Sequence, residues 1–239
     1  MQSHNLDCWS LGLSNAISGD IQLLAHQDLL TAIHFIYQKR EKPLVLVAHS
    51  MGGIIVRVFI SPHLNHPYPL QKIEKMLKGV VLLTVPNHGV ALTDISRIEE
   101  TVRLIQNFIA SKETLAPDLG LGFIQLVSKS QLLKKINSKP PLNPHIKWIN
   151  IVGSFDRIVP LESALFTQNE IEQLPAGNLI QHEFPCDHMT YPLTTTLQKM
   201  TQSIPLLENA LRDTVFRIYP AVHRFPEVGE FILKEMILI

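Results

Sequence analysis

One serine in the chain lies between small residues at the spacing that a strained nucleophile turn requires. Residues 48–52 read Ala-His-Ser-Met-Gly, which matches G-x-S-x-G except that alanine replaces the first glycine. Small residues two before and two after Ser50 let the backbones of a strand and a helix approach closely. Such a turn exposes the Ser50 hydroxyl for attack on a carbonyl carbon, and the Met51 amide then stabilises the oxyanion. We therefore predict Ser50 as a nucleophile and Met51 as an oxyanion-hole donor.

A serine nucleophile needs a histidine base and an acid that orients the base. Asp156 lies in residues 153–160, which read Gly-Ser-Phe-Asp-Arg-Ile-Val-Pro, and His188 follows a later apolar segment. Nucleophile, acid and histidine then occur in the order that this kind of turn demands. Asp187 is a rival acid, although sequence neighbours seldom orient each other's rings. We predict Ser50, Asp156 and His188 as a catalytic triad.

Other histidines stand near these residues in the sequence. His49 directly precedes the nucleophile and His88 follows an apolar segment, so we predict that both line the substrate site, with packing against neighbouring loops as the alternative. A metal site could combine His182, Asp187 and His188, but the sequence contains no His-x-x-x-His or Cys-x-x-Cys spacing. Hydrolysis by a serine needs no cofactor, so we expect neither a metal ion nor a cofactor.

The residues that carry this chemistry follow short apolar segments of the length that buried strands have. These segments are residues 44–48, 79–84, 147–152 and 179–184. Each of them ends in polar residues, and open α/β sheets bind their ligands at the carboxyl ends of parallel strands. The pattern predicts an α/β fold with a mostly parallel sheet, whose carboxyl edge gathers the candidate site.

Helical patterns fill the stretches between the predicted strands. Apolar residues spaced for one helix face predict helices over residues 21–40, 54–60 and 204–218. Residues 92–144 form a long insertion with further helical patterns at 95–109 and 121–136. This insertion is either a lid over the site or a pair of crossover helices that cover the sheet. All of these elements fit one domain that spans residues 1–239.

Composition excludes several classes of protein. The 239 residues are 46% hydrophobic and 18% charged, which suits one globular domain with a substantial core. Lys and Arg balance Asp and Glu at 21 each, so the chain lacks the basic field that nucleic-acid binding needs. No signal peptide or membrane-spanning run is visible, and the compartment stays undetermined. Cys8 and Cys186 permit at most one disulfide.

Residues 46–57 read Leu-Val-Ala-His-Ser-Met-Gly-Gly-Ile-Ile-Val-Arg and resemble the lipase-like α/β-hydrolases, in particular the GPI inositol-deacylase family. Residues 24–37, 153–160 and 187–190 resemble that family's helix before the nucleophile strand, its acid segment and its histidine segment. The resemblance covers roughly residues 20–192. It implies the α/β-hydrolase fold and cleavage of a carboxylic ester in a lipid or in a GPI-inositol-like acyl group. The expected partners are this small-molecule or lipid ester and a membrane in peripheral contact.

The sequence departs from that family before Ser50. Family members begin with strands and with a loop that supplies the second oxyanion amide, whereas the first 42 residues here contain no convincing strand. The strand at 44–48 would then have an exposed apolar edge, which proteins normally avoid. We therefore expect a chain that is truncated at its N-terminus, or a second chain that covers this edge. The alternative function is a weak or inactive hydrolase remnant that acts as a binding module.

Overall fold

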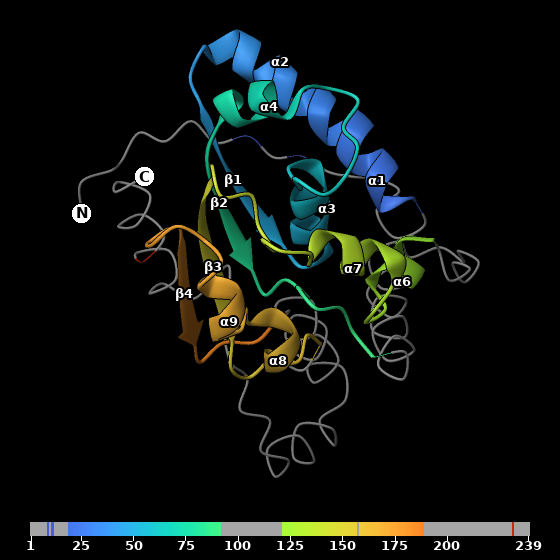
Figure 1. Ribbon diagram of the computed structural model, residues 1–239, viewed down its shortest axis with the longest axis vertical. Coiled ribbons are helices and arrows are strands. Elements are labelled where there is room, and N and C mark those ends of the chain that lie inside the picture. The colour runs from blue at the N-terminus through green and yellow to red at the C-terminus, as the bar shows by residue number, and fades with distance from the viewer. Residues whose placement is uncertain are drawn as a thin grey trace, which may run out of the picture.

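The computed structural model describes Trp9, Leu11, residues 19–91, 121–156 and 158–188, and Phe231. These residues contain a four-stranded sheet with the order β1-β2-β3-β4, and each neighbouring pair is parallel. The strands are β1 (Leu44–His49), β2 (Leu77–Leu83), β3 (Lys147–Gly153) and β4 (Leu179–Phe184). Their carboxyl ends therefore lie along one edge of the sheet, as Figure 1 shows. The parallel sheet predicted from the sequence is confirmed.

Helices precede or follow each strand. They are α1 (Ile21–Leu23), the π-helical η1 (Leu24–Leu29), α2 (Leu30–Arg40), α3 (Met51–Phe59), α4 (Leu70–Met76), α6 (Leu121–Leu126), α7 (Gln131–Ile136), α8 (Leu161–Ala164) and α9 (Gln168–Ile171). The first three form one continuous helical segment, as the sequence predicted for residues 21–40. The helices predicted over 95–109 and 204–218 lie outside the described residues. Whether the 92–144 insertion is a lid therefore stays a prediction.

Local sequence explains where the long N-terminal helical segment begins and ends. The Asp20 carboxylate accepts a hydrogen bond from the backbone N–H of Gln22 at 2.7 Å, which caps the first turn. Glu41 adopts a left-handed conformation with φ 52° at the other end, and its N–H donates to the Tyr37 carbonyl. Pro43 then directs the chain into β1.

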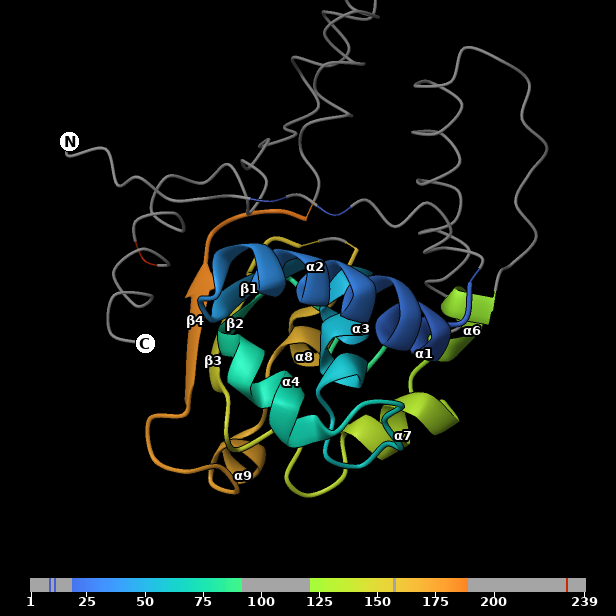
Figure 2. The same ribbon diagram turned by 90° about the horizontal axis from the view of Figure 1, so that it is seen from above.

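Both faces of the sheet are apolar, because successive strand residues point to opposite sides. Val80 and Leu82 of β2 join the larger core cluster, which also contains buried side chains of α1 to α4, α6 and α7. Val81 and Leu83 join a smaller cluster on the opposite face, against which Phe231 packs. Figures 1 and 2 show the described helices α1 to α4 gathered on one side of the sheet. Burial on both faces explains why the strands read as continuous apolar runs.

β1 is an edge strand of the described sheet. It pairs with β2 alone among the described strands, and Val47 near its carboxyl end is 55% exposed. Residues 19–43 contain helix and no strand, as expected from the sequence. The proposal that another chain covers this edge stays a prediction, because most of residues 1–18 are not described.

One of the two cysteines lies in the described part of the chain. Cys186 is a buried free thiol, whereas Cys8 lies outside the described residues. In the described part of the chain, no helix has the length and apolar character that a bilayer crossing requires. Nor do the described residues hold three or more His, Cys, Asp or Glu side chains that could together bind a metal ion.

The first turn of α3 packs tightly against Val85, which follows β2. A Cβ atom placed on Gly53 would lie 2.1 Å from Val85 Cγ2, whereas one on Gly52 would meet nothing within 4 Å. The sequence analysis expected the close packing at Gly52, two residues after Ser50, and this expectation was wrong. The next residue along the helix, Gly53, is the one that faces the neighbouring segment.

We expect Gly53→Ala to lower the free energy of unfolding by about 1–3 kcal/mol, because the added methyl group overpacks a buried contact. Gly52→Ala is the matched control and should be neutral or stabilising by up to about 0.5–1 kcal/mol, since alanine favours helix. Chemical denaturation of both variants checks this. Equal destabilisation by the two changes would contradict the packing described.

Two histidines pack together beside η1. The rings of His26 and His66 meet edge to face, with centroids 5.1 Å apart and planes at 71°. Burial lowers the pKa of His26, and the nearby His66 lowers this pKa further. A hydrogen bond to the Val58 backbone and the charge of Asp20 act in the opposite direction. His26 is therefore neutral in the folded protein over a wider pH range than in the unfolded chain.

This lowered pKa predicts a loss of stability in mild acid. The unfolded chain protonates His26 near pH 6.5, its ordinary value, while the folded chain does so only at lower pH. Stability should therefore be fully present above pH 6.5 and fall as the pH drops through the folded pKa. His26→Phe should flatten this part of a urea-denaturation series. A profile unchanged by His26→Phe would refute the assignment.

Candidate active site

Ser50 occupies a sharp turn between β1 and α3. Its backbone has φ 54° and ψ −132°, a conformation that side-chain-bearing residues rarely adopt. The Ser50 N–H donates to the Leu83 carbonyl at 3.0 Å and so continues the pairing of β1 with β2 by one residue. Strand and helix therefore hold the serine from both sides, and the strained turn sets its hydroxyl at the carboxyl edge of the sheet.

Asp156 lies in the turn that follows β3. Its Oδ1 accepts hydrogen bonds from the backbone N–H groups of Ile158 at 2.9 Å and Val159 at 2.8 Å. These two donors orient the carboxylate and leave Oδ2 for a third partner. The aspartate is thus a positioned acceptor as well as a turn residue.

His188 follows β4, which is separated from β1 by two other strands. The intervening segment turns back across the end of β3, and the Phe155 N–H donates to the Cys186 carbonyl at 3.2 Å. A Cβ atom on Gly153 would lie 2.5 Å from that same carbonyl oxygen. Only glycine at this position lets the backbone pass so closely, and this passage carries His188 back toward Ser50.

The three predicted residues form one hydrogen-bonded chain. His188 Nδ1 lies 2.7 Å from Asp156 Oδ2, and His188 Nε2 lies 2.9 Å from Ser50 Oγ. An ionised aspartate only accepts, so Nδ1 carries the proton and the neutral ring accepts from the serine hydroxyl at Nε2. The side chains of His188 and Asp156 are only 2% and 1% exposed. This arrangement prepares Ser50 to lose its proton to Nε2.

The described residues combine a parallel sheet with a strained serine between a strand and a helix. An acid and a histidine follow two later strands and contact this serine as a hydrogen-bonded chain. The described residues therefore have the arrangement of the α/β-hydrolase fold. No protein-family model matches the chain. A segment of 56 residues is 36% identical to Protein SERAC1 of Danio rerio, and this match covers 23% of the chain and 8% of that protein.

Several solved structures are similar to this hydrolase fold. Aspergillus fumigatus lipase B gives a TM-score of 0.47 at 12% identity, over 70% of this chain and 35% of that one. A bromoperoxidase from Bacillus anthracis gives 0.41 at 18% identity, over 77% and 74%. Bacillus licheniformis lipase BlEst2 in mature form gives 0.39 at 19% identity, over 57% and 49%. The chain spans less than two thirds of both lipases and of SERAC1.

Asp187, the rival acid, has a different partner in this hydrolase fold. Its Oδ1 accepts the backbone N–H of His188 at 2.7 Å, while the His188 ring turns to Asp156. The neighbouring Cys186 thiol is buried, and burial raises its pKa to about 12, with the charges of Asp156 and Asp187 adding to the shift. This thiol therefore stays protonated near neutral pH and is not a competing nucleophile.

The predicted oxyanion donor, Met51, is the first residue of α3. First-turn N–H groups of a helix have no acceptor within the helix itself, so the Met51 amide is free of that competition. The role of Met51 as an oxyanion-hole donor stays a prediction.

The other predicted histidines occupy different places in the hydrolase fold. The His49 ring lies against the His188 ring, with centroids 4.6 Å apart. His88 Nε2 instead donates to the Leu165 carbonyl at 2.9 Å and lies 3.5 Å from Glu170 Oε2. His182 contacts Phe184 and Phe231 and does not join His188. The contacts described for His88 are with α8 and α9, and its predicted place beside the substrate stays untested.

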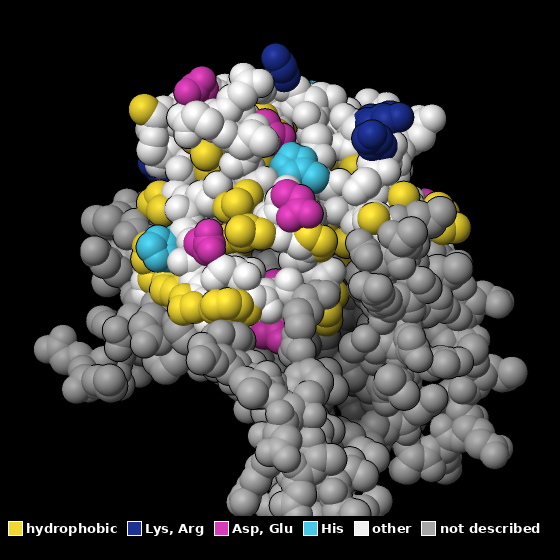
Figure 3. Space-filling model, turned by 90° about the horizontal axis from the view of Figure 1, so that it is seen from below, with side chains coloured by type: hydrophobic (Ala, Val, Ile, Leu, Met, Phe, Trp, Pro, Cys, Tyr) yellow, Lys and Arg dark blue, Asp and Glu magenta, His cyan; other side chains and the backbone are white. Residues whose placement is uncertain are grey.

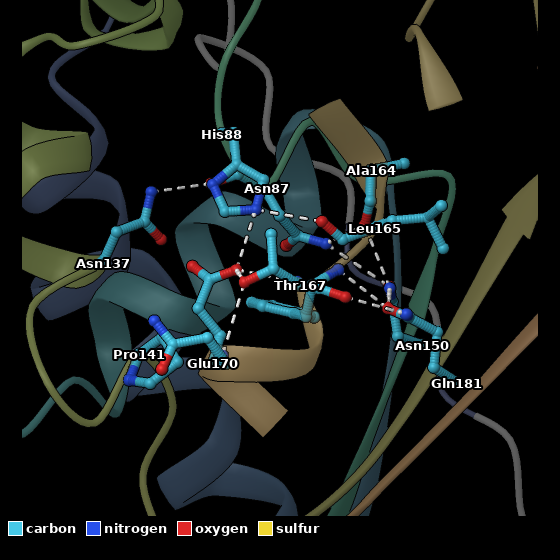
Figure 4. Close-up of polar contacts among 12 residues, drawn as sticks. Asn87, His88, Asn137, Pro141, Asn150, Ala164, Leu165, Thr167, Glu170 and Gln181 are labelled. Carbon is cyan, nitrogen blue, oxygen red and sulfur yellow. Dashed lines mark hydrogen bonds and ion pairs between the residues drawn. The ribbon is translucent and has the colours of Figure 1, made fainter. Parts of the chain in front are cut away.

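Sequence reasoning did not foresee a buried polar cluster behind the serine helix. Figure 4 shows Asn87 and His88 facing Asn137, the end of α8 and Glu170. Arg57 of α3 is 2% exposed, and its Nη1 donates to the Asn87 carbonyl at 3.0 Å and to the Asn87 amide oxygen at 3.2 Å. Its Nη2 donates to Asn137 Oδ1 at 2.6 Å and to the Pro141 carbonyl at 3.1 Å. The sequence signal that could have revealed this cluster is Arg57 itself, the one charged residue of the otherwise apolar helix α3.

The charge of Arg57 is held mainly by neutral acceptors. Burial lowers the pKa of its guanidinium to about 9, and the nearby Glu170 carboxylate opposes this shift. The ring of Phe166 adds a cation–π contact at 5.1 Å. Arg57 therefore remains a cation at neutral pH and ties α3 to three other segments of the chain.

Figure 3 views the molecule from below Figure 1, on the side of the strands' carboxyl ends. Hydrophobic, acidic and histidine side chains are interspersed on the described part of this face. Most of the Lys and Arg side chains in view lie toward its rim.

Substitutions of the two aspartates that contact His188 should change the reactivity of Ser50 to very different extents. We expect Asp156→Asn to slow labelling of Ser50 by a fluorophosphonate by about 10⁴-fold, because the amide no longer favours the Nδ1–H tautomer. Asp187→Asn leaves the hydrogen bond between Asp156 and the His188 ring in place and should cost about 10-fold or less. Circular dichroism controls for folding. Equal losses in the two variants would reject Asp156 as the orienting acid.

Proposed function

We propose that this chain is a serine hydrolase that cleaves carboxylic esters through an acyl-enzyme. The observation that carries the proposal is the continuous hydrogen-bonded chain from Ser50 Oγ through His188 to Asp156. Each residue is held by a different strand end, so the geometry does not depend on one flexible loop. Ser50 is the nucleophile in this proposal, His188 is the base and Asp156 orients the base.

The reaction begins when Ser50 Oγ attacks the ester carbonyl and its proton moves to His188 Nε2. The carbonyl oxygen becomes an oxyanion, to which the Met51 amide donates a hydrogen bond. The intermediate then collapses, the alkoxide leaves with the proton from Nε2, and the acyl group stays on Ser50. Water repeats the sequence with His188 as base, and this releases the carboxylic acid and restores the serine.

The surroundings of the triad suit the charges that develop. Asp156 is nearly fully buried and accepts two backbone N–H bonds, which orient its carboxyl group beside the imidazolium that forms on His188. The close passage over Gly153 fixes the backbone on which His188 is carried. These contacts order the side chains before the reaction starts. Such preorganisation is the main requirement for electrostatic stabilisation of the transition state.

We propose an acyl ester of a lipid as the substrate, with a GPI-inositol-like acyl group as its most specific form. The resemblance of residues 46–57 to the GPI inositol-deacylase family supports this choice. Phe155, which directly precedes Asp156 in the sequence, is 41% exposed. An exposed apolar residue in this turn is compatible with an acyl chain as part of the substrate.

The deciding experiment compares hydrolysis of 4-nitrophenyl esters from acetate to palmitate by the wild-type protein and by Ser50→Ala. We expect activity in the wild type and a loss of about 10⁴-fold or more in the variant, which lacks the nucleophile. Esters of medium or long acyl chains should have the higher kcat/KM.

Three results would count against the proposal. A folded wild-type protein without activity and without fluorophosphonate labelling of Ser50 would favour a non-catalytic binding module. Activity that persists in Ser50→Ala would remove the serine mechanism. A preference for acetate over every longer ester would remove the lipid substrate while leaving the serine mechanism in place.

A further inference from the structure

We infer that His49 is a positioning residue whose ring holds the face of the His188 ring during proton transfer; this inference rests on the proposed function. The two ring centroids are 4.6 Å apart and the ring planes meet at 41°. His49 is the residue immediately before the nucleophile. The serine and the ring that supports its base therefore belong to one dipeptide.

The hydrogen bonds of His188 leave one motion of its ring unrestrained. Both bonds, to Asp156 Oδ2 and to Ser50 Oγ, are made by ring nitrogens and so act in the plane of the ring. They resist sliding within that plane but only weakly resist tilting about the line that joins the two nitrogens. The His49 ring, tilted by 41° to the His188 ring with the centroids 4.6 Å apart, is the neighbour that can resist this tilting.

His49 is well placed to be a fixed neighbour. It is the last residue of β1, paired in register with Leu83 of β2, and the Ser50 N–H extends the same pairing. The sheet thus sets the position of its backbone, and tilting of the His188 ring would bring that ring against the His49 side chain. An aromatic contact of this kind also favours the positive imidazolium that forms when His188 takes the serine proton.

This role differs from the substrate-lining role predicted for His49 from the sequence. A residue that contacts substrate equally in the ground state and the transition state changes KM, whereas one that aligns the base changes kcat. Phenylalanine has a flat ring of similar size, so it should replace His49 in a stacking role but not in a hydrogen-bonding one. The two roles therefore predict opposite results for the same pair of substitutions.

The experiment compares His49→Ala and His49→Phe with the wild type on a short-chain 4-nitrophenyl ester. His49→Ala should lower kcat by about 3- to 10-fold with KM unchanged, and His49→Phe should restore most of that loss. The matched control is His34→Ala, which removes a similar ring contact, with Tyr68 at 4.7 Å, from α2. It should leave kcat unchanged. A raised KM with normal kcat in His49→Ala, or a phenylalanine variant as slow as alanine, would overturn the inference.

Proton NMR gives a second readout that does not require turnover. The His188 Nδ1–H that bonds Asp156 should give a low-field resonance, assigned by its absence in His188→Ala. This resonance should broaden through exchange with water in His49→Ala and stay sharp in His49→Phe. A sharp signal in His49→Ala would refute the positioning role even in an inactive protein. Absence of both ester hydrolysis and Ser50 labelling in the wild type would instead refute the proposed function, and the resonance alone would then decide the role of His49.

Discussion

The geometry of the site depends on the passage of the His188 segment across the end of β3. His188 emerges from β4, which two strands separate from the strand before Ser50, and it can reach the serine only by turning back over the sheet edge. The absence of a side chain at Gly153 allows this, since the Cys186 carbonyl occupies the space that a Cβ atom would fill. The Asp156 and His188 segments are then held together by backbone hydrogen bonds before their side chains meet.

The same edge stores backbone strain in neighbouring positions. Ser50 and Thr84 each follow the last residue of adjacent strands, and both are non-glycine residues with positive φ, at 54° and 45°. A β-branched residue in this conformation is costly, and the buried Thr84 hydroxyl makes no hydrogen bond in the described structure. The surrounding packing must outweigh this cost. Thr84 leads into the segment that packs Val85 against Gly53, so the strained turn brings that segment under the serine helix.

Arg57 holds the segment that contains Val85 from its far side, through a hydrogen bond to Asn87. Its guanidinium reaches Asn87, two residues beyond Val85, and also the segments around Asn137 and Pro141. A buried cation is costly to desolvate, which is why burial lowers its pKa, but several hydrogen bonds to oriented carbonyl and amide oxygens offset that cost. Through Asn87 and Val85, this cluster braces the helix that begins directly after Ser50. The serine turn is thus held by a strand, a buried charge and a close helix contact together.

Sequence alone determined the four described strands and the order of the chemistry. Short apolar runs ending in polar residues identified all four described strands, because buried parallel strands must be apolar throughout and present their ligands at their carboxyl ends. Ser50, Asp156 and His188 were predicted from type and order, and the fold brings their side chains within hydrogen-bonding distance. Tertiary structure alone decided which glycine is crowded, where His88 is directed and which ring contacts that of His188. Those outcomes depend on the register of strands and on contacts between segments 30 to 140 residues apart, and no local pattern in a sequence records such distances.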